Sequence, residues 1–495
     1  MSLSFEELMR RQMAYFRVPG ITAALVHGNE TKYYSFGVKD LEAGDTPANR
    51  VDPQTLFTLA SVSKSFNAAL IARLVDEGIL DWDRPVRAWV PEMRMFDRQA
   101  DEHMCLRDML CHRTGLADHD AMWPSEEGHA RMAAGLRFLE PNLDFRQRYQ
   151  YNNTVYVMAG YAAEAATGKS WHQLLREYIL EPLGMSRTCS RLQDMVASGN
   201  FAEPHKFCHG RVRRVERWPM DEAAAAAGVN SCAEDMARWL RFHLRGGVND
   251  AGVRLISEKN FAEMHTVQIA IPGEGEIPSP DEPILNGYAF GWRQGTYRGR
   301  RYWVHTGHIE GYLTIQSLLP DEDIGVFISM NIHDGCSQVH RRGVYTLLDS
   351  LLGYECDRTE CMRRGEHCAD WLYTDNHQDY IPLATFPCDR EFSPSALSGT
   401  YVHPGYGTLR VLEEEGRLFV SYHFRRDELI PLRGSTWYAE EFMEDTRRVR
   451  MPFEFLPDET GSRATALRIP IERTVAPVIF EKLPCGTDDL ALMRR

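Results

Sequence analysis

The stretch FTLASVSKSFNAALIARLVDEG, residues 57–78, raises the first question about the fold and chemistry of this chain. Its apolar residues recur at helical spacing, charged residues occupy the other face, and Gly78 supplies a C-terminal cap, so the pattern predicts an amphipathic helix over about 61–77. Ser61 and Lys64 fall three positions apart at its start and therefore share one face. The pair is either a reacting group or only a polar helix start, because short Ser-x-x-Lys matches also occur by chance.

The chemical interpretation of the pair is specific. A serine hydroxyl is a poor nucleophile near neutral pH and needs a partner that accepts its proton. A neighbouring lysine can be that partner if its surroundings lower its pKa. At a helix N-terminus the backbone N–H of Ser61 would also lie beside free N–H groups that stabilise an oxyanion. One feature thus offers a nucleophile, a base and half of an oxyanion hole.

Two further stretches carry candidate residues. In RYQYNNTVYVMAGYAAEAATG, residues 148–168, Tyr151 and Asn153 precede a helical pattern. Asn153 is either an N-cap or a substrate-holding amide, and Tyr151 is either a core aromatic or a proton shuttle. In YWVHTGHIEGY, residues 302–312, His305 ends a predicted strand, and the missing side chain of Gly307 would let a substrate backbone lie along the strand edge. A serine-containing alternative to the Tyr151 motif, at residues 198–200, has no supporting pattern.

The pattern of elements predicts an α+β fold. Residues 20–38 read as a hairpin, and strands return at 301–305, 312–319 and 324–332, followed by a helix over about 340–352. Ser170 and Ser231 each begin a capping-box sequence in the helical middle of the chain. Strands at both ends with helices between them predict one antiparallel sheet backed by helices.

After residue 394 the character of the sequence changes. Segments with alternating apolar positions recur between short turns, which is typical of a small antiparallel barrel. We therefore predict a main domain over 1–353, a connecting segment over 354–394 and a barrel domain over 395–485. The barrel has aromatic residues at alternating positions, for which packing is the first interpretation.

Composition limits the function classes. The chain has 495 residues and a formal net charge of −14, which argues against a nucleic-acid partner. The N-terminus lacks the pattern of a signal peptide and no apolar run is long enough for a membrane helix, so we expect a cytoplasmic protein without a membrane partner. The eleven cysteines favour reduced thiols, and the group Cys356, Cys361, His367 and Cys368 lacks the spacing of a zinc site.

Taken in order, Ser-x-x-Lys, Tyr-x-Asn and His-Thr-Gly resemble the motifs of the serine β-lactamase and penicillin-binding-protein superfamily. The Tyr-x-Asn form is similar to its class C branch, which includes D-aminopeptidases, carboxylesterases and acyltransferases. Flanking sequences at 57–66, 106–116, 228–240 and 288–292 agree, and the resemblance covers about 10–352. It implies a β-lactamase-like fold and a site without metal or organic cofactor. The implied catalytic residues are Ser61, Lys64, Tyr151 and His305, and the implied substrate-binding residues are Asn153, Thr306, Gly307 and His308, the last through a backbone N–H that completes the oxyanion hole with Ser61.

One departure from the family matters. His305 stands where β-lactamases usually carry lysine, and a mostly neutral ring is a poor anchor for a substrate carboxylate. The resemblance therefore favours a serine hydrolase that acts on a small peptide or amide, including one that contains a D-residue, or on an ester. The alternatives are a β-lactamase or acyltransferase of the same fold, and a noncatalytic self-assembling scaffold. The C-terminal segment resembles a lipocalin-like domain, which in relatives is thought to shape the cleft or build homo-oligomers.

Overall fold

The computed structural model describes residues 4–122, 128–208, 211–271, 282–333, 338–354, 392–439 and 451–484. The chain divides into two compact units. The first comprises 1–85, 105–113 and 155–375, and the second comprises 86–104, 114–154 and 376–495. The cysteine group at 356–368 and nearly all of the connecting segment predicted at 354–394 lie outside the described residues. The domain boundaries drawn from the sequence therefore stay a prediction.

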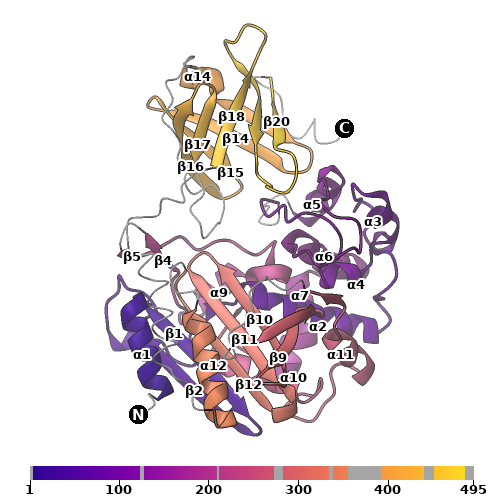
Figure 1. Cartoon of the computed structure of the whole chain (residues 1–495), viewed down its shortest axis with the longest axis vertical. Coiled ribbons are helices and arrows are strands. Elements are labelled where there is room, and N and C mark those ends of the chain that lie inside the picture. Colours follow the sequence, from indigo (N-terminus) through magenta and orange to yellow (C-terminus); the bar gives the residue numbers. More distant parts are fainter. Residues whose placement is uncertain are drawn as a thin grey trace. The chain divides into compact units, whose positions relative to one another are not determined.

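The first unit is built on one eight-stranded sheet with the order β2-β1-β12-β11-β10-β9-β8-β7 (Figure 1). Every neighbouring pair in it is antiparallel. The strands are β1 (Gly20–His27), β2 (Glu30–Gly37), β7 (Ile269–Ala270), β8 (Ile284–Tyr288), β9 (Arg293–Tyr297), β10 (Arg300–Ile309), β11 (Tyr312–Leu319) and β12 (Ile324–Met330).

The centre of the sheet joins the two ends of this unit's sequence. β1 pairs with β12 in a register that runs from Ile21 opposite Met330 to His27 opposite Ile324. All residues of β11 and β12 are buried, because both faces of these strands are covered. β12 is accordingly almost wholly apolar, whereas β11 also buries Thr314, Gln316 and Ser317. The sequence-based prediction of one antiparallel sheet backed by helices is confirmed.

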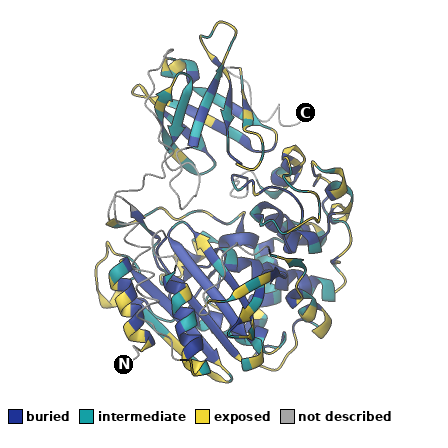
Figure 2. Ribbon diagram, viewed as in Figure 1, coloured by how far each residue is buried: buried dark blue, intermediate teal, exposed yellow. Residues whose placement is uncertain are grey.

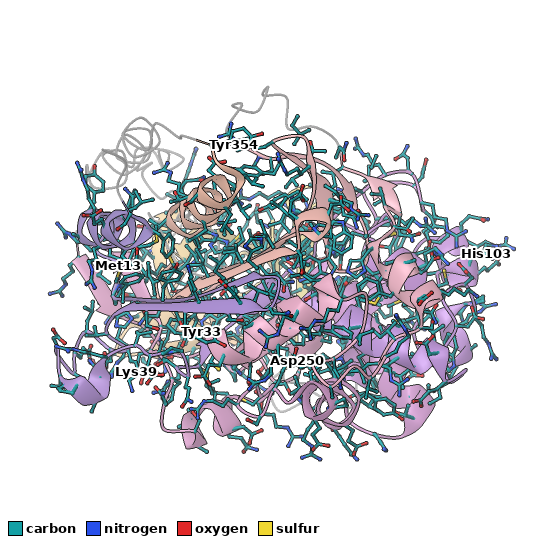
Figure 3. All side chains as sticks on the ribbon, turned by 90° about the horizontal axis from the view of Figure 1, so that it is seen from below. Met13, Tyr33, Lys39, His103, Asp250 and Tyr354 are labelled. Carbon is teal, nitrogen blue, oxygen red and sulfur yellow. The ribbon has the colours of Figure 1, made fainter. Side chains whose placement is uncertain are left out.

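Helices cover both faces of the sheet (Figures 1 and 2). α1 (Phe5–Phe16) and α12 (Val339–Leu352) share a hydrophobic core with one face, where a Cβ at Gly343 would lie 2.7 Å from Ile328. α10 (Ala233–Leu244) packs on the other face, with Leu240 against Gly325. α2 (Ser63–Asp76) lies beside α10, because the rings of Phe66 and Trp239 stack at 3.9 Å. Side chains fill the space between these layers (Figure 3).

Smaller elements complete the description. The remaining α-helices of the described residues are α3 (Arg98–His103), α4 (Leu106–Leu110), α5 (His129–Gly135), α6 (Asn153–Thr167), α7 (Trp171–Leu175), α8 (Glu181–Leu183), α9 (Leu192–Ala197), α11 (Glu258–His265) and α14 (Pro394–Leu397). Two short ladders join β3 (Phe57–Thr58) to β6 (Asn230–Ser231) and β4 (His205–Cys208) to β5 (Arg211–Arg214).

Three local predictions can be judged from the helix termini. Ser170 caps α7 as expected, since its hydroxyl accepts from the Gln173 N–H at 3.3 Å. The cap predicted at Ser231 is wrong: this residue belongs to β6, and Cys232 precedes α10. The helix predicted from Ser61 begins at Ser63. Ser61 itself lies in a tighter 3-10 turn, Ala60–Val62, which leads into α2.

The second unit contains a closed eight-stranded antiparallel barrel, as predicted. Its strands are β13 (Gly399–His403), β14 (Gly407–Glu414), β15 (Arg417–Tyr422), β16 (Arg425–Arg433), β17 (Thr436–Ala439), β18 (Met451–Pro457), β19 (Ala464–Ile469) and β20 (Val478–Lys482). Tyr401, Tyr406 and Tyr422 are buried, and their hydroxyls find partners inside the unit. This agrees with a packing role for the barrel aromatics.

Candidate active site

The structure brings Ser61 and Lys64 into direct contact. The Lys64 ammonium donates to the Ser61 hydroxyl at 3.1 Å and to the Ala226 carbonyl at 3.1 Å. Lys64 is fully buried, whereas Ser61 is half-buried. Ala60, directly before Ser61, has a left-handed φ of 49°, an uncommon conformation for a residue with a Cβ that recurs at functional sites. A reachable hydroxyl thus lies against a sequestered amine.

The contacts of Lys64 fit proton transfer as well as charge pairing. As an ammonium the side chain donates to both oxygens, Ser61 Oγ and the Ala226 carbonyl. As a neutral amine it can keep one N–H on the Ala226 carbonyl while its lone pair faces the Ser61 hydroxyl. The segment Ala224–Gly228, which carries Ala226, is itself held in place, because the N–H of the next residue, Val229, donates to Ser63 Oγ at 3.0 Å. The site therefore holds the amine in one orientation in either protonation state.

Two glycines allow other segments to approach the nucleophile turn. A Cβ at Gly307 would lie 1.9 Å from the Leu59 carbonyl oxygen, so only glycine fits there. Gly291 has a φ of 74°, and a Cβ there would lie 2.7 Å from the backbone of Ser65. The His-Thr-Gly motif and the 288–292 segment are both packed against the backbone around Ser61.

β10 continues through the third motif. The sequence predicted a strand that ends at His305, but β10 runs to Ile309 and pairs with β11 throughout residues 303–309. β9 pairs with β10 only as far as Val304. Within the described residues, the β9-side edge of β10 after Val304 has no strand partner, and the Leu59 carbonyl lies against the face of β10 at Gly307. Thr306 is half-buried on this stretch, and the His308 side chain is exposed. The substrate-binding role that the sequence assigns to this stretch stays a prediction.

His305 is held from both sides of its ring. Its Nδ1 lies 2.8 Å from the Thr306 carbonyl, which can only accept, so Nδ1 carries the proton. Its Nε2, 3.0 Å from the Tyr288 hydroxyl, then accepts from that hydroxyl. The Tyr288 oxygen is also 3.2 Å from His112 Nε2, which must therefore be the donor. The three buried side chains form a chain of hydrogen bonds with fixed tautomers.

Electrostatics keep this chain neutral. Burial, reinforced by the positive charge of Lys64, holds the pKa of His112 well below its usual value. The same two causes, in the same order, lower the pKa of His305, and Arg293 adds to them. Both rings are therefore neutral near pH 7. His305 therefore gives the third motif no permanent positive charge, in agreement with the neutral ring expected from the sequence.

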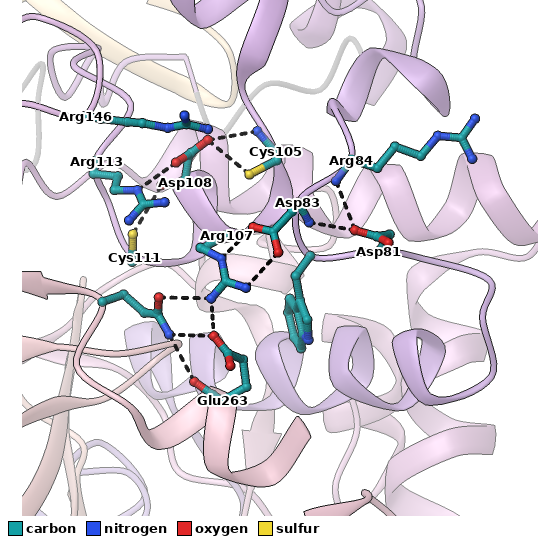
Figure 4. A network of polar contacts seen from close by, with 12 residues as sticks. Asp81, Asp83, Arg84, Cys105, Arg107, Asp108, Cys111, Arg113, Arg146 and Glu263 are labelled. Carbon is teal, nitrogen blue, oxygen red and sulfur yellow. Dashed lines mark hydrogen bonds and ion pairs between the residues drawn. The ribbon is translucent and has the colours of Figure 1, made fainter. Parts of the chain in front are cut away.

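The segment that carries His112 is anchored by α4 (Figure 4). Arg107 forms ion pairs with Asp83, at 2.7 Å, and with Glu263 of α11. Asp108 is completely buried, where its carboxylate accepts from the Cys105 N–H at 3.1 Å and from Arg113 at 2.6 Å. These paired charges fix both ends of the 105–113 segment, because removing either partner would leave a buried charge uncompensated.

Tyr151 and Asn153 belong to the second unit, in the segment 114–154. Asn153 is the first residue of α6, and its amide donates to Asp120 at 3.1 Å. α6 continues into the first unit, where the Tyr156 hydroxyl donates to the Lys64 carbonyl at 3.3 Å. The roles assigned from the sequence to these residues stay predictions.

Sequence reasoning missed three contributors to the site. Ala226 lies in an alanine run without a functional signal, yet its carbonyl accepts from Lys64. His112 and Tyr288 lie in the flanking segments 106–116 and 288–292, to which the sequence assigns no catalytic role, although both belong to the hydrogen-bonded chain at His305. The spacing of buried apolar residues carries no information about such contacts, which join distant segments.

Two surveys of the described residues bear on other function classes. No group of three or more His, Cys, Asp or Glu side chains in the described ranges is arranged to hold a metal ion. None of the helices in the same ranges has the length and apolar character needed to cross a membrane.

Comparisons with known proteins agree with this geometry. Residues 5–348 match the family model described as Beta-lactamase. The chain is 25% identical over 445 residues to the unguisins hydrolase ungD' of Aspergillus campestris, covering 86% of this chain and 80% of that protein. The octameric penicillin-binding protein homologue from Pyrococcus abyssi is 20% identical with a TM-score of 0.60, covering 96% and 99% of the two chains. A D-amino acid amidase from Ochrobactrum anthropi is 23% identical with a TM-score of 0.58, covering 70% and 98%.

Proposed function

The chain belongs to the Beta-lactamase family, and from that premise we propose that it is a serine hydrolase that cleaves a small peptide or amide through a covalent acyl-enzyme. Ser61 is the nucleophile, Lys64 its base and Tyr151 the proton relay. The backbone N–H groups of Ser61 and His308 form the oxyanion hole. Asn153, Thr306 and Gly307 hold the substrate. His305 acts indirectly: its hydrogen bonds fix the position of β10.

The proposed reaction has two halves. In acylation, Ser61 Oγ attacks the substrate carbonyl carbon and its proton passes to Lys64. The oxyanion hole stabilises the charge on oxygen in the tetrahedral intermediate. The intermediate collapses as the proton on Lys64 passes through Tyr151 to the leaving amine, which breaks the C–N bond and returns both side chains to their starting protonation states. In deacylation, water gives a proton to the same base system and attacks the acyl carbon, which releases the acid and restores the Ser61 hydroxyl.

A single observation supports this proposal over a polar helix start. The Lys64 amine lies 3.1 Å from Ser61 Oγ while its side chain is completely buried. A lysine that served only helix solubility would extend into water, because burying an ammonium costs several kcal/mol. Its retention beside a half-buried hydroxyl is typical of an activated nucleophile.

The neutral His305 supports the choice of substrate class. β-Lactams and cell-wall peptides present a carboxylate, for which a lysine at this position is the usual anchor, and both nitrogens of His305 already have protein partners. Two relatives are named for related chemistry: one for the hydrolysis of unguisins and one as an amidase of D-amino acids. We therefore rank amides and peptides first, with a D-residue as an option, and esters second.

Covalent labelling tests the nucleophile. A fluorophosphonate probe should form an adduct on the full chain, located at Ser61 by mass spectrometry, and the Ser61→Ala variant should form none. Circular dichroism and a melting curve establish that the variant is folded. Labelling of folded Ser61→Ala to the wild-type extent would overturn the proposed nucleophile.

Turnover tests the substrate class. The panel contains L- and D-aminoacyl amides, short-chain esters, an unguisin and a chromogenic cephalosporin. We expect kcat/KM for the best amide or peptide to exceed that for the cephalosporin, and the reverse order would contradict the ranking. Added amines or alcohols in the same assay distinguish hydrolysis from acyl transfer by their products.

A noncatalytic scaffold is the competing function. It is supported by the barrel domain and by the octameric state of one structural neighbour, which also supports self-association of this chain. Light scattering during gel filtration measures the mass in solution. Self-association without any Ser61-dependent adduct would favour the scaffold, whereas an adduct supports the hydrolase in any oligomeric state.

A further inference from the structure

Residues 116–121, here called the strap, run beside the predicted proton relay in the second unit. On one side the strap accepts hydrogen bonds from residues that flank Tyr151. The Gln150 amide donates to the Leu116 carbonyl at 2.9 Å, and the buried Asn152 amide donates to the Ala117 carbonyl at 2.5 Å. The Asp120 carboxylate accepts from Asn153. Residues on both sides of Tyr151 are thus attached to the strap.

On its other side the strap is held by the barrel. The His119 N–H donates to the carboxylate of Glu472, which follows β19, at 3.0 Å. The Nδ1 atom of His119 lies 2.5 Å from the hydroxyl of Tyr406, the residue directly before β14. The Ala121 carbonyl accepts from the His423 ring at 3.1 Å, and it shares the Tyr422 hydroxyl, at 3.1 Å, with the nearer Tyr406 carbonyl at 2.8 Å. The barrel therefore contacts the strap through at least four side chains.

His119 is the centre of this arrangement. Its Nε2 lies 2.9 Å from the Glu140 carbonyl, which can only accept, so Nε2 carries the proton and Nδ1 accepts from Tyr406. The residue is 1% exposed and has a left-handed φ of 44°. A residue with a Cβ holds this conformation only where its surroundings fix it. Here the surroundings are the barrel residues and Glu140.

The anchoring groups have little freedom to find other partners. Tyr406 is 3% exposed and Glu472 is 7% exposed. Burial raises the pKa of Glu472, but hydrogen bonds from Thr474 and from the His119 N–H outweigh it, so the net shift is downward and the carboxylate stays ionised. A charged acceptor and a buried hydroxyl that converge on one residue form a rigid contact, because losing either bond leaves a buried group unsatisfied.

We propose that Tyr406 and Glu472 of the barrel are positioning residues for the active site, which hold Tyr151 and Asn153 in place through His119 and the strap. This inference deepens the proposed function and rests on the role of Tyr151 as proton relay. It assigns the barrel a part in catalysis at named residues. Neither residue needs to touch the substrate, because the strap transmits their position to residues 150–153.

The test compares tyrosines that differ only in their partner. Tyr406→Phe removes the bond to His119, and Glu472→Gln weakens the acceptor of the His119 N–H. Tyr401→Phe is the matched control, because Tyr401 is equally buried in the same barrel and donates to the Leu397 carbonyl at 2.6 Å, away from the strap. All three variants are made in the full chain, and melting curves report their stability.

Two readouts are measured for each variant. With the best substrate of the panel, kcat/KM should fall about tenfold in Tyr406→Phe and in Glu472→Gln, with a changed pH–rate profile, and stay at the wild-type level in Tyr401→Phe. Hydrogen exchange should accelerate at the amides of residues 116–121 and 150–153 in the first two variants only. Wild-type kcat/KM and wild-type exchange in both folded variants would overturn the proposal, as would an equal loss in Tyr401→Phe.

The exchange readout separates this proposal from the proposed function. If the wild-type chain forms no Ser61 adduct and turns over no substrate, the proposed hydrolase fails, while faster exchange at 150–153 still supports the positioning contact. If the wild-type chain is active and exchange is unchanged in both variants, the positioning role fails and the hydrolase stands.

Discussion

The nucleophile turn and the strap hold their candidate residues in different ways. Around Ser61, backbone lies against backbone: Gly307 and Gly291 exist because Leu59 and Ser65 leave no room for a Cβ. Around Tyr151, the contacts are side-chain amides and hydroxyls that reach backbone carbonyls. Direct backbone packing tolerates almost no change, whereas a hydrogen-bonded strap can be adjusted one residue at a time.

The difference predicts how severely a substitution acts in each region. Positions at the nucleophile turn accept few substitutions, since a Cβ would displace the main chain. Strap contacts contribute about 0.5–1.5 kcal/mol each, so a substitution there shifts a loop rather than disrupting the fold. The following predictions challenge this contrast, beginning with the largest effect.

Lys64→Met should abolish the activity that the nucleophile turn supports. The variant keeps the length and burial of the side chain but removes the base, so kcat/KM should fall about 10²–10⁴-fold. The melting temperature should hold or rise, because an apolar side chain replaces a buried charge. Initial rates and a thermal melt measure both effects. The control is Lys169→Met, at a half-buried lysine that pairs with Glu177 at 2.6 Å. Equal activity of Lys64→Met and wild type would contradict the role of Lys64.

Gly291→Ala and Gly299→Ala separate steric contact from backbone strain. Their φ values are 74° and 77°, but a Cβ at Gly291 meets the Ser65 backbone at 2.7 Å, whereas one at Gly299 meets nothing within 4 Å. Both variants should lose about 1–2 kcal/mol from the left-handed conformation. Only Gly291→Ala should also lose activity, by about 10–100-fold, because the nucleophile helix is displaced.

Urea unfolding and initial rates measured on both glycine variants decide this prediction. Equal activity of the two would show that the close approach at Gly291 does not set the geometry of Ser61. The contrast between the two regions would then lose its main support.

Tyr288→Phe tests whether side-chain hydrogen bonds also matter near Ser61. Without the Tyr288 hydroxyl, His305 Nε2 and His112 Nε2 each lose a buried hydrogen-bond partner. We therefore expect the free energy of unfolding to fall by about 1–3 kcal/mol and kcat to fall about tenfold. Tyr297→Phe is the matched control, since its buried hydroxyl donates to Asp349 at 2.8 Å, away from the nucleophile. Denaturation and kcat are measured for both. A loss of stability without a loss of kcat in Tyr288→Phe would confine its role to folding.

Acid should destabilise the first unit through a second pair of buried histidines. His243 Nδ1 and His265 Nε2 lie 3.1 Å apart, and burial lowers the pKa of His265 to about 4 and that of His243 well below its usual value. Because these pKa values lie below the unfolded value of about 6.5, their stabilisation is complete above pH 6.5 and is lost as the pH falls toward 4.

For each of these histidines, lowering the pH from 7 to 5 should reduce the free energy of unfolding by about 2 kcal/mol. Urea unfolding of the wild type and of His243→Gln at the two pH values measures the effect. The variant should show the smaller change with pH. An equal change in both proteins would assign the acid sensitivity to other groups.

Local sequence patterns predicted most of the fold and part of the candidate site. β11 was predicted with its observed bounds, and the barrel followed from alternating apolar positions. The Ser61–Lys64 contact followed from spacing, although Ser61 lies in the turn before α2 because Ala60 turns the chain left-handed. The prediction of a helix cap at Ser231 was wrong because this residue pairs with Phe57 in the ladder of β3 and β6, and local helix-capping patterns contain no information about such a distant contact.

What the sequence could not provide is contact between distant segments. Tyr288 joins His112 across 176 positions, and Glu472 joins His119 across 353. Such bonds leave no period and no motif, since any buried donor can serve any buried acceptor. The family resemblance placed the three motifs around one hydroxyl, but it did not indicate which atoms of His305 remain available to a substrate.

The pairing of β1 with β12 has a consequence for how the protein is made. The ribosome releases residues 20–37 as a hairpin long before Ile324–Met330 emerge, yet β12 lies directly against β1 in the finished sheet. During that interval the apolar edge of the hairpin is open to other chains. Nascent polypeptides that stop before residue 330 lack the strand that covers it, so chaperone binding to arrested chains should persist until that length is passed.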